Sequence, residues 1–279
     1  MKKRSPILLA IWLALSLSGC SSFRGATGTT PLRVLTFNIH HGEGLDGKVD
    51  VERIAKLILE SKADLVALQE VDRGVERTKK IDIMTTLADL TGMTYAFGKN
   101  VEYQGGEYGN GMLVRFPILE ERNHHYQMVR PGEQRGLLQL VLEVKGEEIL
   151  FINTHLDHRQ GDTDRVSGAG EIRDVIKRFT PRPIILCGDF NDTSGSRTIS
   201  LLKDDFVDAW ELTGTGRGMT WPADTPRQRI DYVFISKGEA ASSVRLTPLS
   251  ARVLNSNASD HLPLLVELEL KTGKEKGSR

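Results

Sequence analysis

The sequence predicts an α/β domain in which two packed mixed β-sheets are flanked by helices. Many apolar runs have the length of strands, and few segments have the periodicity of a helix. The order of these segments suggests parallel as well as meandering connections, which favours two packed sheets with helices outside them. No glycine-rich turn follows the first apolar run, so a single Rossmann sheet is disfavoured.

The first half of the chain is predicted to contain most of the strands and two helices. Residues 32–39 form an apolar strand, and Asp50 caps a helix whose apolar face consists of Val51, Ile54, Ala55 and Ile58. A buried strand follows at residues 64–69, and a helix near residues 81–90. Further strands are predicted near residues 94–97, 109–115, 118–127 and 137–144.

The second half is predicted to contain a long helix, a short helix and the remaining strands. After a strand at 149–155, a helix near 165–179 buries Ala169, Ile172, Val175, Ile176 and Phe179. The run IILC at 184–187 is apolar at every position, as expected for a strand buried on both faces. A helix near 197–202 precedes strands at 229–236, 243–254 and 262–270.

The first 19 residues resemble a bacterial lipoprotein signal peptide. A basic start precedes an apolar stretch at residues 6–17, which is shorter than the roughly 18 apolar residues of a membrane span. The stretch ends in LSGC, and in lipoproteins this cysteine is lipidated and becomes the first mature residue. The resemblance implies lipidation at Cys20 in the bacterial cell envelope, and Ser21 favours the outer membrane. An ordinary secretory signal with a chance cysteine is the alternative.

Composition limits the remaining organisation of the chain. The 37 basic residues less Lys2, Lys3 and Arg4 leave 34, against 37 acidic residues, whereas proteins that grip a nucleic-acid backbone are usually basic. With Cys20 acylated, Cys187 has no disulfide partner within the chain. Residues 20–31 are predicted to be a tether, 32–270 a single domain, and 271–279 a disordered polar tail.

The stretch IILCGDFND at residues 184–192 ends a buried strand in an acid and an amide. Residues two apart in an extended chain point to the same side, so Asp189 and Asn191 are expected to face one spot. Open α/β sheets tend to bind ligands at the carboxyl ends of their strands. A simple turn is the alternative for this stretch taken by itself.

Polar residues follow or interrupt several other apolar runs. They are Asn38, Gln69, Glu70, Asn153, His155, Asp231, Asp260 and His261. Each could be a cap, a turn residue or a satisfied core side chain. Together they would require a polar exception at six separate strand ends, and burying unpaired charge is costly. Convergence on one cleft that holds a cation and a phosphate would offset this cost.

The oxygen-rich residues Asn38, Glu70 and Asp260 predict a site for Mg²⁺, which prefers hard oxygen ligands. The sequence has no cysteine cluster and no HExxH motif for zinc. The pairs His40-His41 and His124-His125 are not expected to share a metal, because adjacent residues of a strand point to opposite faces.

Seven motifs resemble, in their order, those of the endonuclease/exonuclease/phosphatase superfamily. They are NIH (38–40), LQEVD (68–72), GNGMLVR (109–115), NTHLD (153–157), GDFND (188–192), RIDYVF (229–234) and SDHLP (259–263). The superfamily includes pancreatic-type deoxyribonucleases, abasic-site endonucleases, inositol polyphosphate 5-phosphatases and neutral sphingomyelinases. The resemblance implies a four-layer α/β sandwich with the active site at one edge.

The resemblance also implies a role for each of the metal-site and water-site residues. Glu70 matches the principal Mg²⁺ ligand, with Asn38 and Asp260 close to the ion and Mn²⁺ as an alternative to Mg²⁺. Asp189 matches the acid that orients the attacking water, and Asn191 the amide that holds the phosphate.

Two histidines complete the implied catalytic set. His261 matches the histidine at the phosphate, and Asp231 the carboxylate paired with it. His155 matches the histidine of the nuclease and sphingomyelinase branches, and its partner stays open between Glu107 and Tyr108. Such a set can neutralise phosphoryl charge, aim a water in line and assist the leaving oxygen.

The predicted function is Mg²⁺-dependent hydrolysis of a phosphodiester by in-line attack of water. A lipid headgroup or small-molecule ester is favoured, because NIHHGEGLDGK (38–48) fits the branch associated with glycosylphosphatidylinositol processing and the lipid holds the enzyme beside the membrane. Trp221, the aromatic candidate for membrane contact, is expected in the core. The alternatives are a nuclease that takes DNA or RNA and a non-catalytic binding lipoprotein. We expect a monomer.

Overall fold

The computed structural model describes residues 29–179, 181–237 and 244–272. The expected signal peptide, Cys20, most of the tether and most of the tail lie outside these ranges. Within them, no helix is both long enough and apolar enough to cross a membrane.

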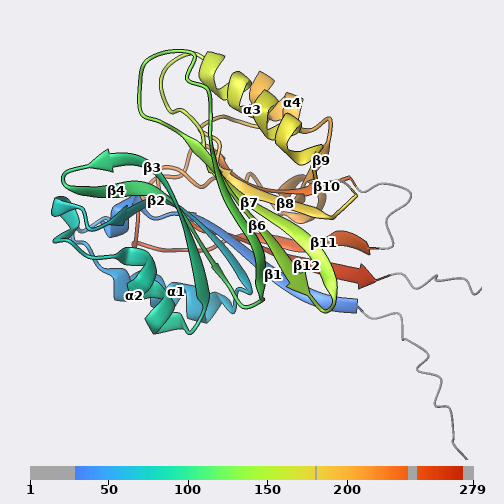
Figure 1. Cartoon of the computed structure of the whole chain (residues 1–279), viewed down its shortest axis with the longest axis horizontal. Coiled ribbons are helices and arrows are strands. Elements are labelled where there is room, and N and C mark those ends of the chain that lie inside the picture. The colour runs from blue at the N-terminus through green and yellow to red at the C-terminus, as the bar shows by residue number, and fades with distance from the viewer. Residues whose placement is uncertain (1–28, 180, 238–243, 273–279) are drawn as a thin grey trace, which may run out of the picture.

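The two predicted sheets are present, and each has six strands (Figure 1). In spatial order the first sheet contains β11 (Val244–Val253), β12 (Leu264–Thr272), β1 (Thr29–Asn38), β2 (Leu65–Arg73), β4 (Gly106–Val114) and β3 (Thr94–Tyr103). The second contains β5 (Ile118–His125), β6 (Gly136–Val144), β7 (Glu147–His155), β8 (Ile184–Asp189), β10 (Asp231–Ser236) and β9 (Phe206–Asp208). Both sheets are mixed, because β1–β2 and β7–β8 are parallel pairs among antiparallel neighbours.

Helices cover the outer faces of the two sheets, which confirms the four-layer sandwich (Figure 1). Helices α1 (Val51–Ser61) and α2 (Ile83–Thr91) pack on the first sheet, and α3 (Thr163–Ile176) and α4 (Arg197–Leu202) pack on the second. The expected cap is present, because the Asp50 side chain accepts a hydrogen bond from the Arg53 backbone N–H at 2.8 Å.

Alternation along the central strands explains why their sequences are continuously apolar. In β8, Ile185 and Cys187 belong to the core between the sheets, whereas Ile184 and Leu186 pack beneath the helices. Both faces of the strand are therefore dry, as the run IILC predicted. The free thiol of Cys187 is buried in this core.

The two chain ends are more ordered than the sequence predicted. Thr29 pairs with Lys271 across β1 and β12, so residues 29–31 of the expected tether and residues 271–272 of the expected tail are strand. Backbone hydrogen bonds make this pairing, and the polar side chains do not reveal it. Strand β9 and helix α5 (Ala209–Thr213) were also not predicted, because both are shorter than the periodic patterns that reveal an element.

The topology brings the predicted polar residues to one edge of the sandwich. Asn38 ends β1 and is the register partner of Gln69 in β2. In the second sheet, His155 ends β7 and pairs with Asp189, which also pairs with Asp231 at the start of β10. The carboxyl ends of the parallel pairs β1–β2 and β7–β8 therefore lie at the same edge of the sandwich.

Candidate active site

Asp189 lies at the centre of this edge and is buried. Its Oδ2 accepts a hydrogen bond from Asn38 Nδ2 at 3.0 Å, and its Oδ1 accepts one from the Asn191 backbone N–H at 2.9 Å. Gly188 is required before it, because a Cβ there would lie 2.1 Å from the backbone oxygen of Thr154. Burial, and next the Asp231 carboxylate, raise the pKa of Asp189 to about 7.

His261 and Asp231 form the pair that the sequence predicted. Nδ1 of His261 lies 3.0 Å from Oδ2 of Asp231, and its Nε2 lies 3.7 Å from Oδ2 of Asp189. Burial opposes the imidazolium charge, but Asp231 and Asp189 outweigh it and raise the pKa of His261 to about 10. Arg229, two residues before Asp231 in the chain, donates instead to Asp208 at 2.7 Å.

His155 lies on the other side of Asp189, and its partners were not predicted. Arg135 Nη1 lies 2.9 Å from His155 Nδ1, and Asn191 Nδ2 lies 3.1 Å from its Nε2. Nε2 is 3.6 Å from Oδ2 of Asp189. Burial, and then the charge of Arg135, hold the pKa of His155 well below its usual range, so the imidazole is neutral.

The two partners considered for His155 are engaged elsewhere. The Glu107 carboxylate pairs with Arg73, and the Tyr108 ring lies under the Arg77 guanidinium. Both residues lie in the β3–β4 hairpin region of the first sheet, whereas Arg135 directly precedes β6, the strand beside β7. The chain thus places a cation where the sequence suggested a carboxylate or a phenol.

Side-chain oxygens that could bind a divalent metal lie beside this cluster. Asn38 Nδ2 donates to Glu70 Oε1 at 2.9 Å, and Glu70 has a φ of 59° at a β-bulge between Leu68 and Val71. The bulge turns the Glu70 side chain out of the alternation of β2. The Asp260 side chain is 40% exposed, and its Oδ1 lies 4.0 Å from His40 Nδ1. Two partly exposed carboxylates and an amide are a suitable donor set for Mg²⁺ or Mn²⁺.

Comparison with known proteins agrees with this architecture. The Endonuclease/Exonuclease/phosphatase family model matches residues 35–261, which is most of the chain. The protein belongs to the endonuclease/exonuclease/phosphatase family. The protein YbhP of Escherichia coli K12 is 28% identical over 250 residues, which span 85% of this chain and 96% of YbhP.

Solved structures of the endonuclease/exonuclease/phosphatase family share the fold. A family protein from Bacteroides thetaiotaomicron is 21% identical with a TM-score of 0.71, covering 87% of this chain and 98% of its own. The mannosyl-6-phosphatase Bt3783 of the same organism is 21% identical with a TM-score of 0.70 and coverages of 85% and 99%. The human Nocturnin catalytic domain, solved with a bound sulfate anion, is 22% identical with a TM-score of 0.68 and coverages of 88% and 97%.

Two further residues lie in places other than the sequence predicted. Trp221 was expected in the core, but it is half-buried and its Nε1 donates to Asp260 Oδ2 at 3.4 Å. Asn153 is buried between the sheets, where it donates to the Leu68 and Gly111 carbonyls and accepts from Gln69. The polar Asn153 and Gln69 side chains therefore join the two sheets beneath the site.

Proposed function

We propose that this protein is a metal-dependent phosphodiesterase that hydrolyses its substrate by in-line attack of water. The observation that carries the proposal is the position of Asp189. Its buried carboxylate lies 3.6 Å from one imidazole and 3.7 Å from another, and the oxygen donors of Asn38 and Glu70 adjoin it. This arrangement supplies a base, two groups for phosphoryl oxygens and a cation site within one edge.

Asp189 is the group that aims the water and accepts its proton. A carboxyl group with a pKa near 7 is well matched to proton transfer at neutral pH. Asn191, held by its hydrogen bonds to Asp189 and to the Leu156 carbonyl, and neutral His155 lie on one side of Asp189, where their N–H groups can stabilise charge on a phosphoryl oxygen.

His261 acts from the opposite side of Asp189. Asp231 holds the imidazole by its Nδ1, which leaves Nε2–H directed toward Asp189 and the substrate position. The imidazolium can donate to a phosphoryl or leaving oxygen.

Asn38, Glu70 and Asp260 would hold a divalent ion, for which Mg²⁺ and Mn²⁺ suit the oxygen donors. When bound, such an ion neutralises negative charge on the phosphoryl group. Asn38 also donates to Asp189, so Glu70, Asn38 and the proposed base are held in one hydrogen-bonded unit.

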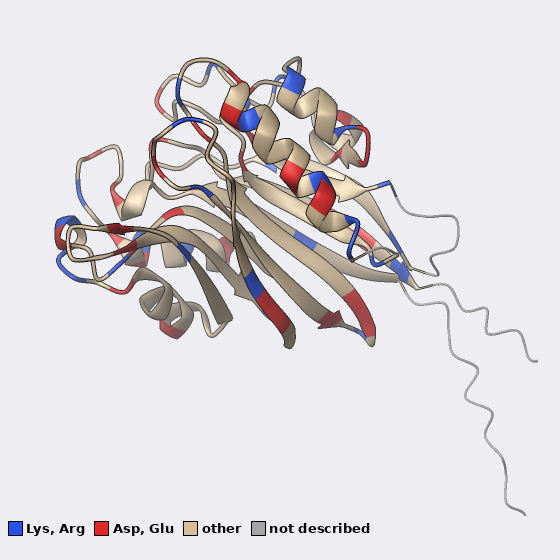
Figure 2. Cartoon of the chain, turned by 45° about the horizontal axis from the view of Figure 1, so that its top comes forward, with Lys and Arg blue, Asp and Glu red and all other residues tan. Residues whose placement is uncertain are grey.

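The substrate we favour is a phospholipid headgroup or another small phosphodiester. Basic and acidic residues are interspersed along the ribbon in the view of Figure 2, which does not favour a nucleic-acid backbone as the substrate. We further propose that Cys20 carries a lipid that anchors the enzyme in the bacterial cell envelope, with the outer membrane favoured. The anchor would hold the site beside membrane lipids.

A substrate panel tests the proposal. Phosphomonoesters, a small diester, phospholipid vesicles and DNA are assayed with Mg²⁺, with Mn²⁺ and with EDTA. Metal-dependent cleavage of the diester or the phospholipid is expected. Preferential, salt-sensitive cleavage of DNA would instead identify a nuclease, and no cleavage of any ester would favour a binding protein.

A further inference from the structure

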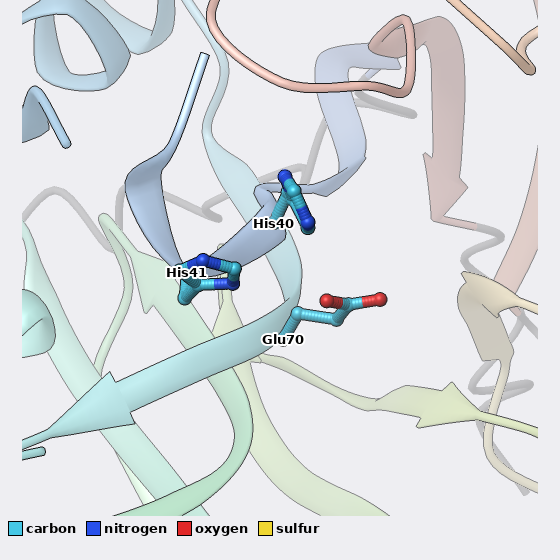
Figure 3. A group of neighbouring side chains, drawn as sticks. All are labelled: His40, His41 and Glu70. Carbon is cyan, nitrogen blue, oxygen red and sulfur yellow. The ribbon is translucent and has the colours of Figure 1, made fainter. Parts of the chain in front are cut away.

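Two histidines adjoin the oxygen-rich metal edge but have no role in the mechanism above. His40 and His41 are the first two residues of the short 3-10 helix η1 (His40–Gly42), which follows β1 after Ile39. One ligand atom from each of His40, His41 and Glu70 lies within 4.8 Å of the other two (Figure 3). Figure 3 shows both imidazoles on the side of β2 from which Glu70 projects.

The backbone explains how adjacent histidines reach one place. The sequence-based expectation that they would diverge assumed an extended strand, but His40 has a φ of 44° and His41 a φ of 45°. Both are left-handed conformations that non-glycine residues seldom adopt. The turn brings the two ring centroids within 4.4 Å of each other. The assumption that the two side chains point to opposite faces is therefore wrong.

His41 offers a nitrogen that has no protein partner. The residue is 8% exposed, and its Nδ1 makes no hydrogen bond within the described part of the chain. Leaving a buried polar atom unpaired is costly. Its other nitrogen, Nε2, lies 3.6 Å from the Glu43 carboxylate. A carboxylate beside the second ring nitrogen is a common arrangement for a histidine that binds a metal.

His40 connects this cluster with the other end of the metal edge. Its Nδ1 lies 4.0 Å from Oδ1 of Asp260, and its side chain is about one-third exposed, at 34%. Its backbone N–H donates to Asn38 Oδ1 at 3.1 Å. His40 is therefore near both Glu70 and Asp260 and is partly exposed to solvent.

We propose that His40 and His41 provide nitrogen ligands, together with Glu70, for a divalent transition-metal ion of the Zn²⁺ or Co²⁺ class. Imidazole nitrogen suits these ions, whereas Mg²⁺ prefers oxygen. The ion shares Glu70 with the oxygen-rich position formed with Asn38 and Asp260. The inference rests on the proposed function only because both assign a metal-binding role to Glu70.

Cobalt binding provides a test that does not require turnover. Chelator-stripped full-length protein is titrated with Co²⁺, and the visible d–d absorption and the affinity are recorded. The double variant His40→Ala/His41→Ala should bind at least about 10-fold more weakly, because even the outer partners of metal ligands contribute 10- to 100-fold. Its d–d spectrum should also lose the contribution of nitrogen ligands.

A matched control is available on another strand. His124 and His125 are also adjacent, but they lie on β5 and outside this cluster. The variant His124→Ala/His125→Ala should therefore retain the wild-type Co²⁺ affinity and spectrum. If the double variant at 40 and 41 does not fold, the single variant at the more exposed His40 gives the same comparison.

Co²⁺ affinity and spectrum that are unchanged in the folded His40 and His41 variants would overturn the inference, as would a wild type that binds no stoichiometric Co²⁺. Phosphoester hydrolysis is measured separately. An inactive wild type that binds Co²⁺ through both histidines would remove the proposed function and support this site. An active enzyme whose Co²⁺ binding is unchanged by replacing both histidines would support the proposed function and remove this site.

Discussion

Arg135 donates a hydrogen bond from Nη1 to Nδ1 of His155 across 2.9 Å, and both side chains are buried. A guanidinium cannot accept a hydrogen bond, so Nδ1 must carry the lone pair of a neutral imidazole. The single ring proton is therefore on Nε2, the atom that faces Asp189 and Asn191. The contact between Asn191 Nδ2 and this Nε2–H is then not a hydrogen bond, and Nδ2 donates instead to the Leu156 carbonyl at 3.1 Å. Arg135 thus sets the tautomer in which His155 can donate to a phosphoryl oxygen.

Replacing Arg135 should impair turnover by releasing this tautomer. In Arg135→Met, kcat should fall about 10²-fold, the scale for removing one donor from a charge-stabilising site. The pKa of His155 should rise, because the charge of Arg135 adds to burial in lowering it. Imidazole ¹⁵N NMR checks both the tautomer and the pKa. Arg122→Met, at an exposed position of β5, is the control. An unchanged NMR spectrum with normal kcat would show that Arg135 does not position His155.

His261 and Asp231 should behave as one unit. His261→Ala should lower kcat by at least about 10²-fold, since a positioned proton donor contributes on this scale. Asp231→Asn should cost a similar factor, and the double variant should be little worse than either single variant. Measuring kcat per folded molecule separates catalysis from stability. Mild losses that multiply in the double variant would indicate a structural pair at the sheet edge.

The low pKa of His155 predicts how stability depends on pH. The native imidazole stays neutral below pH 6.5, whereas the unfolded one takes up a proton there, so the unfolded state binds more protons. His155 therefore lowers the free energy of unfolding as the pH falls below 6.5, whereas Asp189, whose pKa is raised to about 7, contributes a change of opposite sign. On acidification, His155→Gln should become more stable relative to the wild type in urea denaturation, with His124→Gln, a partly exposed position, as the control. Parallel curves for wild type and His155→Gln would contradict a buried neutral histidine.

The proposed anchor depends on one side chain. Cys20→Ser should move the protein from the membrane fraction to the soluble fraction, because a serine cannot carry the lipid. Fractionation and mass spectrometry of the mature amino terminus test this. A wild type that is soluble, with its signal removed at another residue, would refute the lipoprotein interpretation.

Sequence patterns predicted the parts of the fold that depend on periodic burial. The continuous apolar run before Asp189 indicated a strand covered on both faces, and β8 lies between two cores. The spacing of two residues between Asp189 and Asn191 predicted only that their side chains point to the same side. Asn191 has a φ of 50°, so the chain turns at this residue. The turn allows its backbone N–H to donate to Asp189 while its side-chain amide contacts His155.

Features that depend on local turns and distant contacts could not be predicted in this way. His40 and His41 converge because of a left-handed turn, which no hydrophobic period encodes. Arg135 is 20 residues from His155 and reaches it only because β6 and β7 are neighbours. Trp221 reaches Asp260 from a loop. In each case the spatial neighbour is set by the pairing of strands or loops, and residue type alone does not identify it.

The most direct measurement of the central claim is hydrolysis of a small phosphodiester by wild type and Asp189→Asn. Both are stripped with a chelator, and divalent ions are then restored singly. We predict that the wild type loses activity on stripping and regains it with a divalent ion, while folded Asp189→Asn is at least about 10²-fold slower in kcat under every ion. Full activity in the verified metal-free wild type, or normal kcat in Asp189→Asn, would contradict a metal-dependent mechanism centred on Asp189.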